Sequence, residues 1–180
     1  RAMPFADIPV GSYYYDAVLW AVENGITKGT SDTTFSPNMT CSRAQIVAFL
    51  WRSEKSPAAG TANPFADVKS TAYYADAVLW AVKENITKGT TSTTFSPNAD
   101  CTRAQIVTFL WRAAGCPAPA LAENPFVDVK STDYCYDAVL WAVQTGVAKG
   151  TSRTTFSPDA PCTRGQIVTF LYRVAGSPSG

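Results

Sequence analysis

The sequence contains no histidine, so it lacks the residue that most often acts as a general base or a metal ligand. Charged residues form only 16% of the chain and nearly cancel, leaving a net charge of +1. This balance gives neither the basic footprint of a nucleic-acid-binding protein nor the polybasic patch of a membrane-surface protein. No apolar run approaches the ~18–20 residues that a membrane span needs, and we therefore expect no membrane insertion.

The five cysteines show no C-x-x-C spacing, which argues against a zinc site, and no other pattern calls for a cofactor. Cys41, Cys101 and Cys162 occupy equivalent positions of the repeat described below, and we expect them to be buried free thiols. Cys116 and Cys135 have no counterparts in the other copies, and a disulfide between these two is left open.

The first residues also lack the basic and apolar regions of a secretory signal peptide. Either the export information lies outside this sequence or the protein is not exported. Because the sequence starts and stops at the edges of a repeat, we expect it to be one module of a longer protein.

What the sequence does contain is a unit repeated three times: Phe5, Phe65 and Phe126 correspond, at spacings of 60 and 61 residues. Stretches rich in proline and alanine separate the copies and predict irregular linkers. We expect one integrated module with repeat 1 at 1–53, a linker at 54–64, repeat 2 at 65–115, a linker at 116–125 and repeat 3 at 126–180.

Each copy predicts two helices, with an aromatic residue (Phe35 in the first copy) pinning the loop between them to the core. In repeat 1, apolar residues at helical spacing predict a helix over 13–24, and Gly25 follows as a left-handed stop. A capping box, Ser42 with Gln45, then opens a second helix from Arg43 to about residue 52. This helix is apolar around most of its circumference, so it must be buried on several sides. The chain is therefore predicted to be all-α, with three such helices packed together at the centre.

Several motifs carry a family resemblance: Phe-x-Asp-Val/Ile, an aromatic, Ala-Val, Gly-Ile-x-x-Gly, Phe-x-Pro and Thr-Arg-Ala-Gln. Together they resemble the S-layer homology domain, and the resemblance covers nearly the whole chain in three tandem copies. It implies a pseudo-threefold spindle of helix-loop-helix repeats around a central three-helix bundle. The chain departs from the family pattern at two positions in every repeat. The family's Glu is replaced by Gln45, Gln105 and Gln166, and its Trp is replaced by Tyr13, Tyr73 and Tyr134. In the third repeat, Gly165 also replaces Ala.

The resemblance also implies a function. Grooves between neighbouring repeats would bind an anionic secondary cell-wall polysaccharide, commonly one bearing a pyruvate ketal, and would anchor an exported protein to the bacterial cell wall without a covalent bond. We expect a monomeric module of a larger cell-surface protein rather than an enzyme, because carboxylates are few and a glycosidase needs a pair of them. A protein-interaction or lattice-assembly module is the alternative.

The candidate ligand-binding residues recur in all three repeats. Arg43, Arg103 and Arg164 stand at helix starts, where a cation is mildly unfavourable, and a guanidinium grips a carboxylate bidentately. The competing interpretation is an exposed residue that pairs locally with Asp7, Asp67 or Asp128. Under the first interpretation these arginines have no structural role, and replacing any one of them by Ala would abolish binding at one groove and leave the fold intact.

The remaining candidates each have a structural alternative. Lys28, Lys88 and Lys149, followed by Gly29, Gly89 and Gly150, lie in the segment that the family places near the ligand; the lysines are also suited to complement a helix dipole. Trp20, Trp80 and Trp141 would form groove walls or pack in the core. Asp7, Asp67 and Asp128 would bind a sugar hydroxyl or the Arg, or cap neighbouring backbone amides as turn formers.

Overall fold

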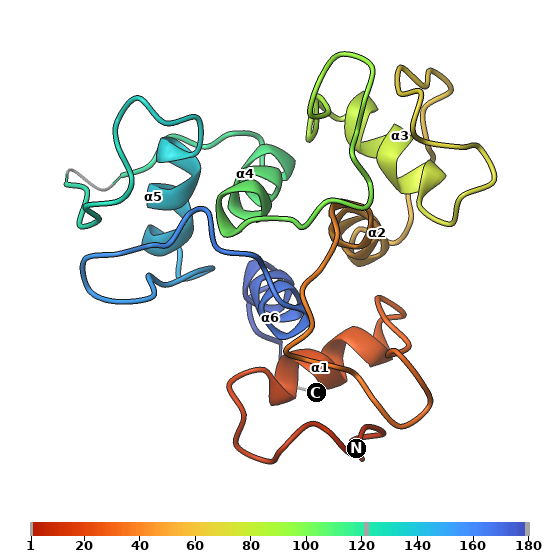
Figure 1. Cartoon of the computed structure of the whole chain (residues 1–180). Coiled ribbons are helices and arrows are strands. Elements are labelled where there is room, and N and C mark those ends of the chain that lie inside the picture. Colours follow the sequence, from red (N-terminus) through yellow and green to blue (C-terminus); the bar gives the residue numbers. More distant parts are fainter. Residues whose placement is uncertain (1, 121–122, 179–180) are drawn as a thin grey trace.

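The part of the chain described by the computed structural model, residues 2–120 and 123–178, contains six helices and no strand. The first helices of the repeats are α1 (Tyr15–Glu23), α3 (Ala75–Lys83) and α5 (Tyr136–Gln144), and the second helices are α2 (Arg43–Ser53), α4 (Arg103–Ala113) and α6 (Arg164–Val174). Figure 1 shows α2, α4 and α6 around a central axis with the first helices outside them. The predicted all-α fold with a central three-helix bundle is confirmed. Residue 1, residues 121–122 of the second predicted linker and residues 179–180 of the third predicted repeat lie outside the described residues.

The central helices begin at the predicted capping boxes. In α2 the Ser42 hydroxyl accepts a hydrogen bond from the Gln45 amide at 3.2 Å, and the Gln45 side chain accepts from the Ser42 amide at 2.9 Å. The same reciprocal pair opens α4 and α6. Glutamine therefore replaces the family's glutamate in this role without loss, because the box needs only a side-chain oxygen.

The outer helices are shorter at their start than the sequence pattern predicts. Helix α1 begins at Tyr15 rather than at residue 13, because Ser12 to Tyr15 form a turn and the cap residue Tyr14 has no side-chain oxygen within reach of the helix amides. The ends follow the prediction. Gly25, Asn85 and Gly146 all have left-handed φ values, of +70°, +61° and +78°.

Each central helix packs against the outer helix of the following repeat. Helix α2 packs on α3, α4 on α5, and α6 returns to α1 at the start of the chain (Figure 1). Because every repeat supplies one helix to each of two interfaces, no copy buries its own apolar faces alone. Three fully buried rings, Phe35, Phe95 and Phe156, hold the loops between the two helices of each repeat to this core, as predicted.

Backbone hydrogen bonds join the repeats at the starts of the central helices. The Cys41 amide donates to the Cys162 carbonyl, Cys101 to Cys41 and Cys162 to Cys101, so the three form a closed ring. The three side chains are fully buried free thiols, as predicted. Burial raises the pKa of Cys41 and of Cys101 to about 12.

The two other cysteines are also free in this structure, Cys116 exposed and Cys135 buried. Within the described residues, no cluster of Cys, Asp or Glu side chains has the arrangement of a metal site. None of the helices described is both long and apolar enough to cross a membrane.

Candidate functional site: a cationic groove between repeats

The repeated arginines lie at the seams between repeats. Arg164 begins α6 but extends into the first repeat, where its Nε donates to the Phe35 carbonyl at 2.7 Å. Its guanidinium carbon lies 4.6 Å from the centre of the Phe35 ring and 5.4 Å from that of Phe49. Arg43 and Arg103 make the same bond to Phe95 and Phe156, at 2.8 and 3.0 Å. Each arginine thus fastens one repeat to the loop of the next.

These contacts correct two sequence-based expectations. The arginines are buried, with 4–5% of their surface exposed, so the idea that they have no structural role is wrong. The interpretation as exposed residues that pair with Asp7, Asp67 or Asp128 is equally wrong. The amides at the helix starts are also occupied, since Arg43 N donates to Ala99 O and Ala44 N to Pro97 O. An anion therefore finds no free backbone donors at these positions.

The seam at which Arg164 of the third repeat meets the first repeat contains a hollow of about 470 Å³, which we call groove 1. Its lining comes from all three repeats: Gly25, Thr27, Lys28, Gly29, Gln45, Ala48, Phe49 and Arg52 of the first, Tyr73 of the second and Arg164 of the third. The structure therefore brings together the predicted Arg, Lys and Gly positions, which lie far apart in the sequence.

Groove 1 has a uniformly positive lining. Lys28, Arg52 and Arg164 are its ionisable groups other than the phenol of Tyr73, and no carboxylate lines it. Lys28 is exposed and has no side-chain hydrogen bond or ion pair with any described residue. Arg52 is half-buried, and its Nη1 donates to the Ile26 carbonyl at 3.1 Å.

Arg164 keeps donors available to the groove. Burial lowers the pKa of its guanidinium, while Cys41 and Asp7 oppose that effect. It has no ion pair with any described carboxylate, and beyond its Nε bond only Nη2 makes a contact, with the Thr27 hydroxyl at 3.4 Å. No fully buried side-chain nitrogen among the described residues lacks a hydrogen-bond partner, so Nη1, the one guanidinium nitrogen of Arg164 without a bond, is not fully buried, and Arg164 lines the groove.

Seven of the ten lining residues of groove 1 were not among the sequence-based candidates, and Tyr73 and Arg52 are the two of them with an aromatic or charged side chain suited to a ligand outside the core. Tyr73 is 60% exposed and lies close to Arg52 and Arg164. Partial burial raises the pKa of its phenol, and those two cations act in the opposite direction. The signal that could have found Tyr73 was the aromatic at this position in all three repeats. Arg52 gave a comparable signal, with Arg112 and Arg173 as its counterparts.

The glycine and aspartate candidates have structural roles. A Cβ on Gly29 would lie 2.5 Å from the Phe5 ring, and its φ of +86° also disfavours other residues. The Asp7 carboxylate accepts hydrogen bonds from the Phe35 and Ser36 amides at 2.9 and 2.8 Å. Asp67 and Asp128 do the same in their repeats, and Gly89 and Gly150 also lie against Phe rings. These aspartates fix the loop whose carbonyl the arginine holds.

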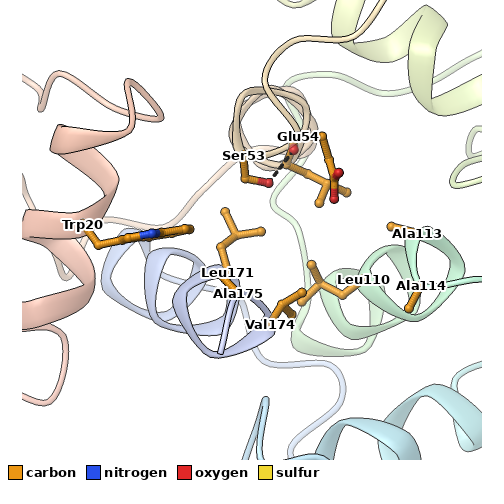
Figure 2. A pocket seen from close by; sticks show the side chains of 10 residues that line it. Trp20, Ser53, Glu54, Leu110, Ala113, Ala114, Leu171, Val174 and Ala175 are labelled. Atoms are coloured by element: carbon orange, nitrogen blue, oxygen red, sulfur yellow. Dashed lines mark hydrogen bonds between the residues drawn. The ribbon is translucent and has the colours of Figure 1, made fainter. Parts of the chain in front are cut away.

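None of the tryptophan candidates lines groove 1. Trp80 and Trp141 are 6% and 8% exposed, in agreement with the core-packing alternative. Trp20 is half-buried and lies against α6 in Figure 2, where it borders a mostly apolar cavity of about 120 Å³ at the C-terminal ends of the central helices. A further hollow of about 350 Å³ runs from Trp20 to Gly25 and Arg52, at the edge of groove 1.

Equivalent residues lie at the other two seams, where Arg112 donates to the Ile86 carbonyl and Arg173 to the Val147 carbonyl as Arg52 does to Ile26. The site around Arg43, Lys88, Arg112 and Tyr134 is called groove 2 here, and the site around Arg103, Lys149, Arg173 and Tyr13 is called groove 3. In both, the guanidinium lies over the ring of the neighbouring central helix, Arg43 over Phe109 at 5.5 Å and Arg103 over Phe170 at 5.8 Å. Lys88 and Lys149 are exposed, as Lys28 is.

Comparison with known proteins identifies this architecture. The model of the S-layer homology domain matches residues 4–47, 64–107 and 125–168. The chain belongs to the S-layer homology family. The three matched segments each contain the outer helix, the loop and the start of the central helix, and therefore include the groove lysines and Arg43, Arg103 and Arg164, whereas Arg52, Arg112 and Arg173 follow the matched segments.

Similar proteins include surface-layer proteins and an enzyme. The chain is 32% identical to the surface-layer 125 kDa protein of Lysinibacillus sphaericus, over 91% of this chain and 14% of that protein. It is 31% identical to an endoglucanase of Bacillus sp. (strain KSM-635), over 97% of this chain and 19% of the enzyme. It is 24% identical to the S-layer protein sap of Bacillus anthracis, over 94% of this chain and 21% of that protein.

The chain thus spans about a fifth or less of the length of these relatives. The family and the surface-layer relatives indicate an exported protein of the cell surface or wall, with these three repeats as its anchoring module. The match is to S-layer homology repeats alone.

Proposed function

We propose that the three repeats anchor their parent protein by binding an anionic secondary cell-wall polysaccharide in the grooves between repeats, without catalysis. The observation that carries this proposal is the lining of groove 1. Lys28, Arg52 and Arg164 face one hollow without a carboxylate, and Arg164 is a buried cation that has no ion-pair partner among the described residues. A buried charge is costly unless it is paired, and a bound anion supplies the missing partner.

A carboxylate on a rigid sugar ring fits this chemistry. The terminal nitrogens of Arg164 and the ammonium of Lys28 supply charge-assisted hydrogen bonds, which are about twice as strong as neutral ones. Tyr73 offers an exposed ring face to a sugar and a hydroxyl to its substituents. The hollow of about 470 Å³ lies within the usual size range of small-molecule sites. A terminal sugar with a pyruvate ketal combines these features.

The proposed absence of catalysis rests on the same lining. Hydrolysis of a glycan by the common mechanism needs two carboxylic acids on either side of the scissile bond. Groove 1 has none, and the nearby Asp7 carboxylate is held by two loop amides. Groove 1 therefore offers cations that bind a polymer but no acid and base pair that would cleave it.

A sedimentation assay tests the proposal. Wall sacculi of a Gram-positive bacterium with a pyruvylated secondary polymer are compared with sacculi from which the polymer has been extracted by acid. We expect the chain to sediment with the first and not with the second, and we expect sodium chloride to weaken its retention because screening acts on exposed cations such as Lys28. Undiminished binding to the stripped sacculi would refute the proposal and favour a protein or peptidoglycan partner.

A further inference from the structure

The third repeat differs from the other two beside its lysine. In the first repeat the Thr27 hydroxyl accepts a hydrogen bond from the Gly29 amide at 3.1 Å. In the second, the Thr87 hydroxyl accepts from the Gly89 amide at the same distance. The third repeat has Ala148 at this position, so it has no hydroxyl to hold the amide of Gly150.

The backbone that follows Ala148 takes a different course. Gly29 and Gly89 have φ values of +86° and +83°, whereas Gly150 lies outside the left-handed region. The carbonyl of Lys149 accepts a hydrogen bond from Arg103 Nη2 at 2.7 Å. No described bond links Arg164 to the Lys28 carbonyl or Arg43 to that of Lys88. The peptide between residues 149 and 150 therefore points its oxygen at the arginine of groove 3.

We propose that the residue at this position, Thr or Ala, sets the affinity of each groove, and that groove 3 is the weak site of this chain. This inference rests on the proposed function of the grooves. Arg103 donates from Nε to the Phe156 carbonyl and from Nη2 to the Lys149 carbonyl. Arg43 donates only from Nε, to the Phe95 carbonyl. Arg164 donates from Nε to the Phe35 carbonyl and makes one further, long contact, from Nη2 to the Thr27 hydroxyl.

Two effects weaken groove 3 for an anion. A ligand carboxylate must compete with the Lys149 carbonyl for a guanidinium donor, and the same carbonyl presents its negative end toward the ligand. The loss of one charge-assisted hydrogen bond corresponds to an association constant of groove 3 for the anion that is lower by about tenfold or more. The exposed Lys149 and half-buried Arg173 still give groove 3 a positive field, so weak binding remains.

The arginine side chains themselves report on each groove. Arg43, Arg103 and Arg164 each donate Nε–H to a carbonyl and are almost fully buried, so we expect these protons to exchange slowly with water and to give separate NMR signals. The three signals are followed while the methyl glycoside of a pyruvylated N-acetylhexosamine is added to the whole chain. We expect the Arg103 signal to respond at ligand concentrations about tenfold or more above those for Arg164.

Two reciprocal substitutions test the cause. Ala148→Thr restores the hydroxyl, and we expect the Arg103 response to move to the concentration range of Arg164. Thr27→Ala removes the hydroxyl from groove 1, and we expect the Arg164 response to weaken toward that of Arg103. Thermal unfolding of both variants shows that they are folded, and the two unmodified grooves serve as internal controls in each sample.

The outcomes separate the two proposals. If none of the three signals moves on addition of the pyruvylated sugar, the proposed function itself fails. If all three move with one affinity, or if Arg103 responds first, the glycan proposal stands and the weakness of groove 3 is refuted. If Arg103 is weak but Ala148→Thr leaves it weak, the assignment of the cause to this residue is refuted.

Discussion

The Nε of Arg164 donates a hydrogen bond to the carbonyl of Phe35, a residue 129 positions earlier in the chain. The corresponding bonds of Arg43 and Arg103 connect a repeat to the next one along the sequence, whereas this bond joins the last repeat to the first. It closes the threefold ring, and the same guanidinium supplies a cation to groove 1. Closure of the fold and charge in the groove therefore depend on one side chain.

Removal of this side chain should destabilise the protein. In Arg164→Ala, the Phe35 carbonyl loses its donor and two phenylalanine rings lose a packed cation. We expect the free energy of unfolding in urea to fall by about 1–3 kcal/mol. Arg164→Lys keeps the charge but has no Nε, so it should recover only part of this loss. Arg153→Ala, which removes an exposed arginine, is the control. An unchanged urea midpoint for Arg164→Ala would show that the bond does not hold the repeats together.

Local features of the fold were predictable, and the role of the arginine was not. The capping box at Ser42 depends on two side chains three residues apart, so the sequence contains all of it. The acceptor of Arg43 Nε lies 52 residues away, on a loop carbonyl that no residue pattern reveals. The sequence around an arginine at a helix start therefore contains no structural partner for it, because the partner is distant along the chain.

The same distinction explains which candidate positions lie together in groove 1 and which do not. Lys28 and Arg164 were singled out because they recur in every copy, and the fold brings them to one groove. Tyr73 was overlooked because groove 1 receives it from the following repeat, through the packing of α2 on α3. Trp20 was chosen from its place at the edge of a helical stripe, but the rotation of α1 turns it toward α6.

The buried thiols should make the fold sensitive to alkaline pH. The pKa of Cys101 is about 12 in the folded chain and has an ordinary value of 9.0. Above pH 9.0 the unfolded chain loses this proton and the folded chain keeps it, so the stability that is complete below pH 9.0 declines as pH rises toward about 12. Each such thiol should lower the free energy of unfolding by about 1.4 kcal/mol per pH unit within this window.

Comparison of the wild type with Cys101→Ala isolates this effect. Both proteins are unfolded with urea at a series of pH values across the window. The variant should be less stable at neutral pH because a small cavity replaces the sulfur, but its stability should decline less steeply with pH. Parallel pH profiles for the two proteins would mean that this thiol ionises equally in the folded and unfolded chains.

The aspartate of the Phe-x-Asp motif should act on stability through the loop. Asp7 accepts from the amides of Phe35 and Ser36, so Asp7→Asn leaves one acceptor oxygen and Asp7→Ala leaves none. We expect unfolding free energies in the order wild type, Asn variant, Ala variant, with a cost of up to about 1–3 kcal/mol for each amide left without a partner. Asp16→Ala on the exposed face of α1 is a suitable control. Equal stability of the two Asp7 variants would contradict the two-bond geometry.

Lys28 is the residue that best separates binding from stability. Its side chain is exposed and makes no hydrogen bond or ion pair with any described residue, yet it lines groove 1 beside Arg164. We expect Lys28→Ala to leave the melting temperature unchanged and to weaken the response of the Arg164 Nε–H signal to the pyruvylated sugar, by about tenfold for a lost charge-assisted hydrogen bond. Lys69→Ala removes an exposed lysine that does not line groove 1, and it should change neither quantity.

Lys28→Glu should weaken binding further than Lys28→Ala, because it places a negative charge beside the bound carboxylate. If Lys28→Glu binds the sugar as tightly as the wild type, the cationic lining of groove 1 does not recognise the anion.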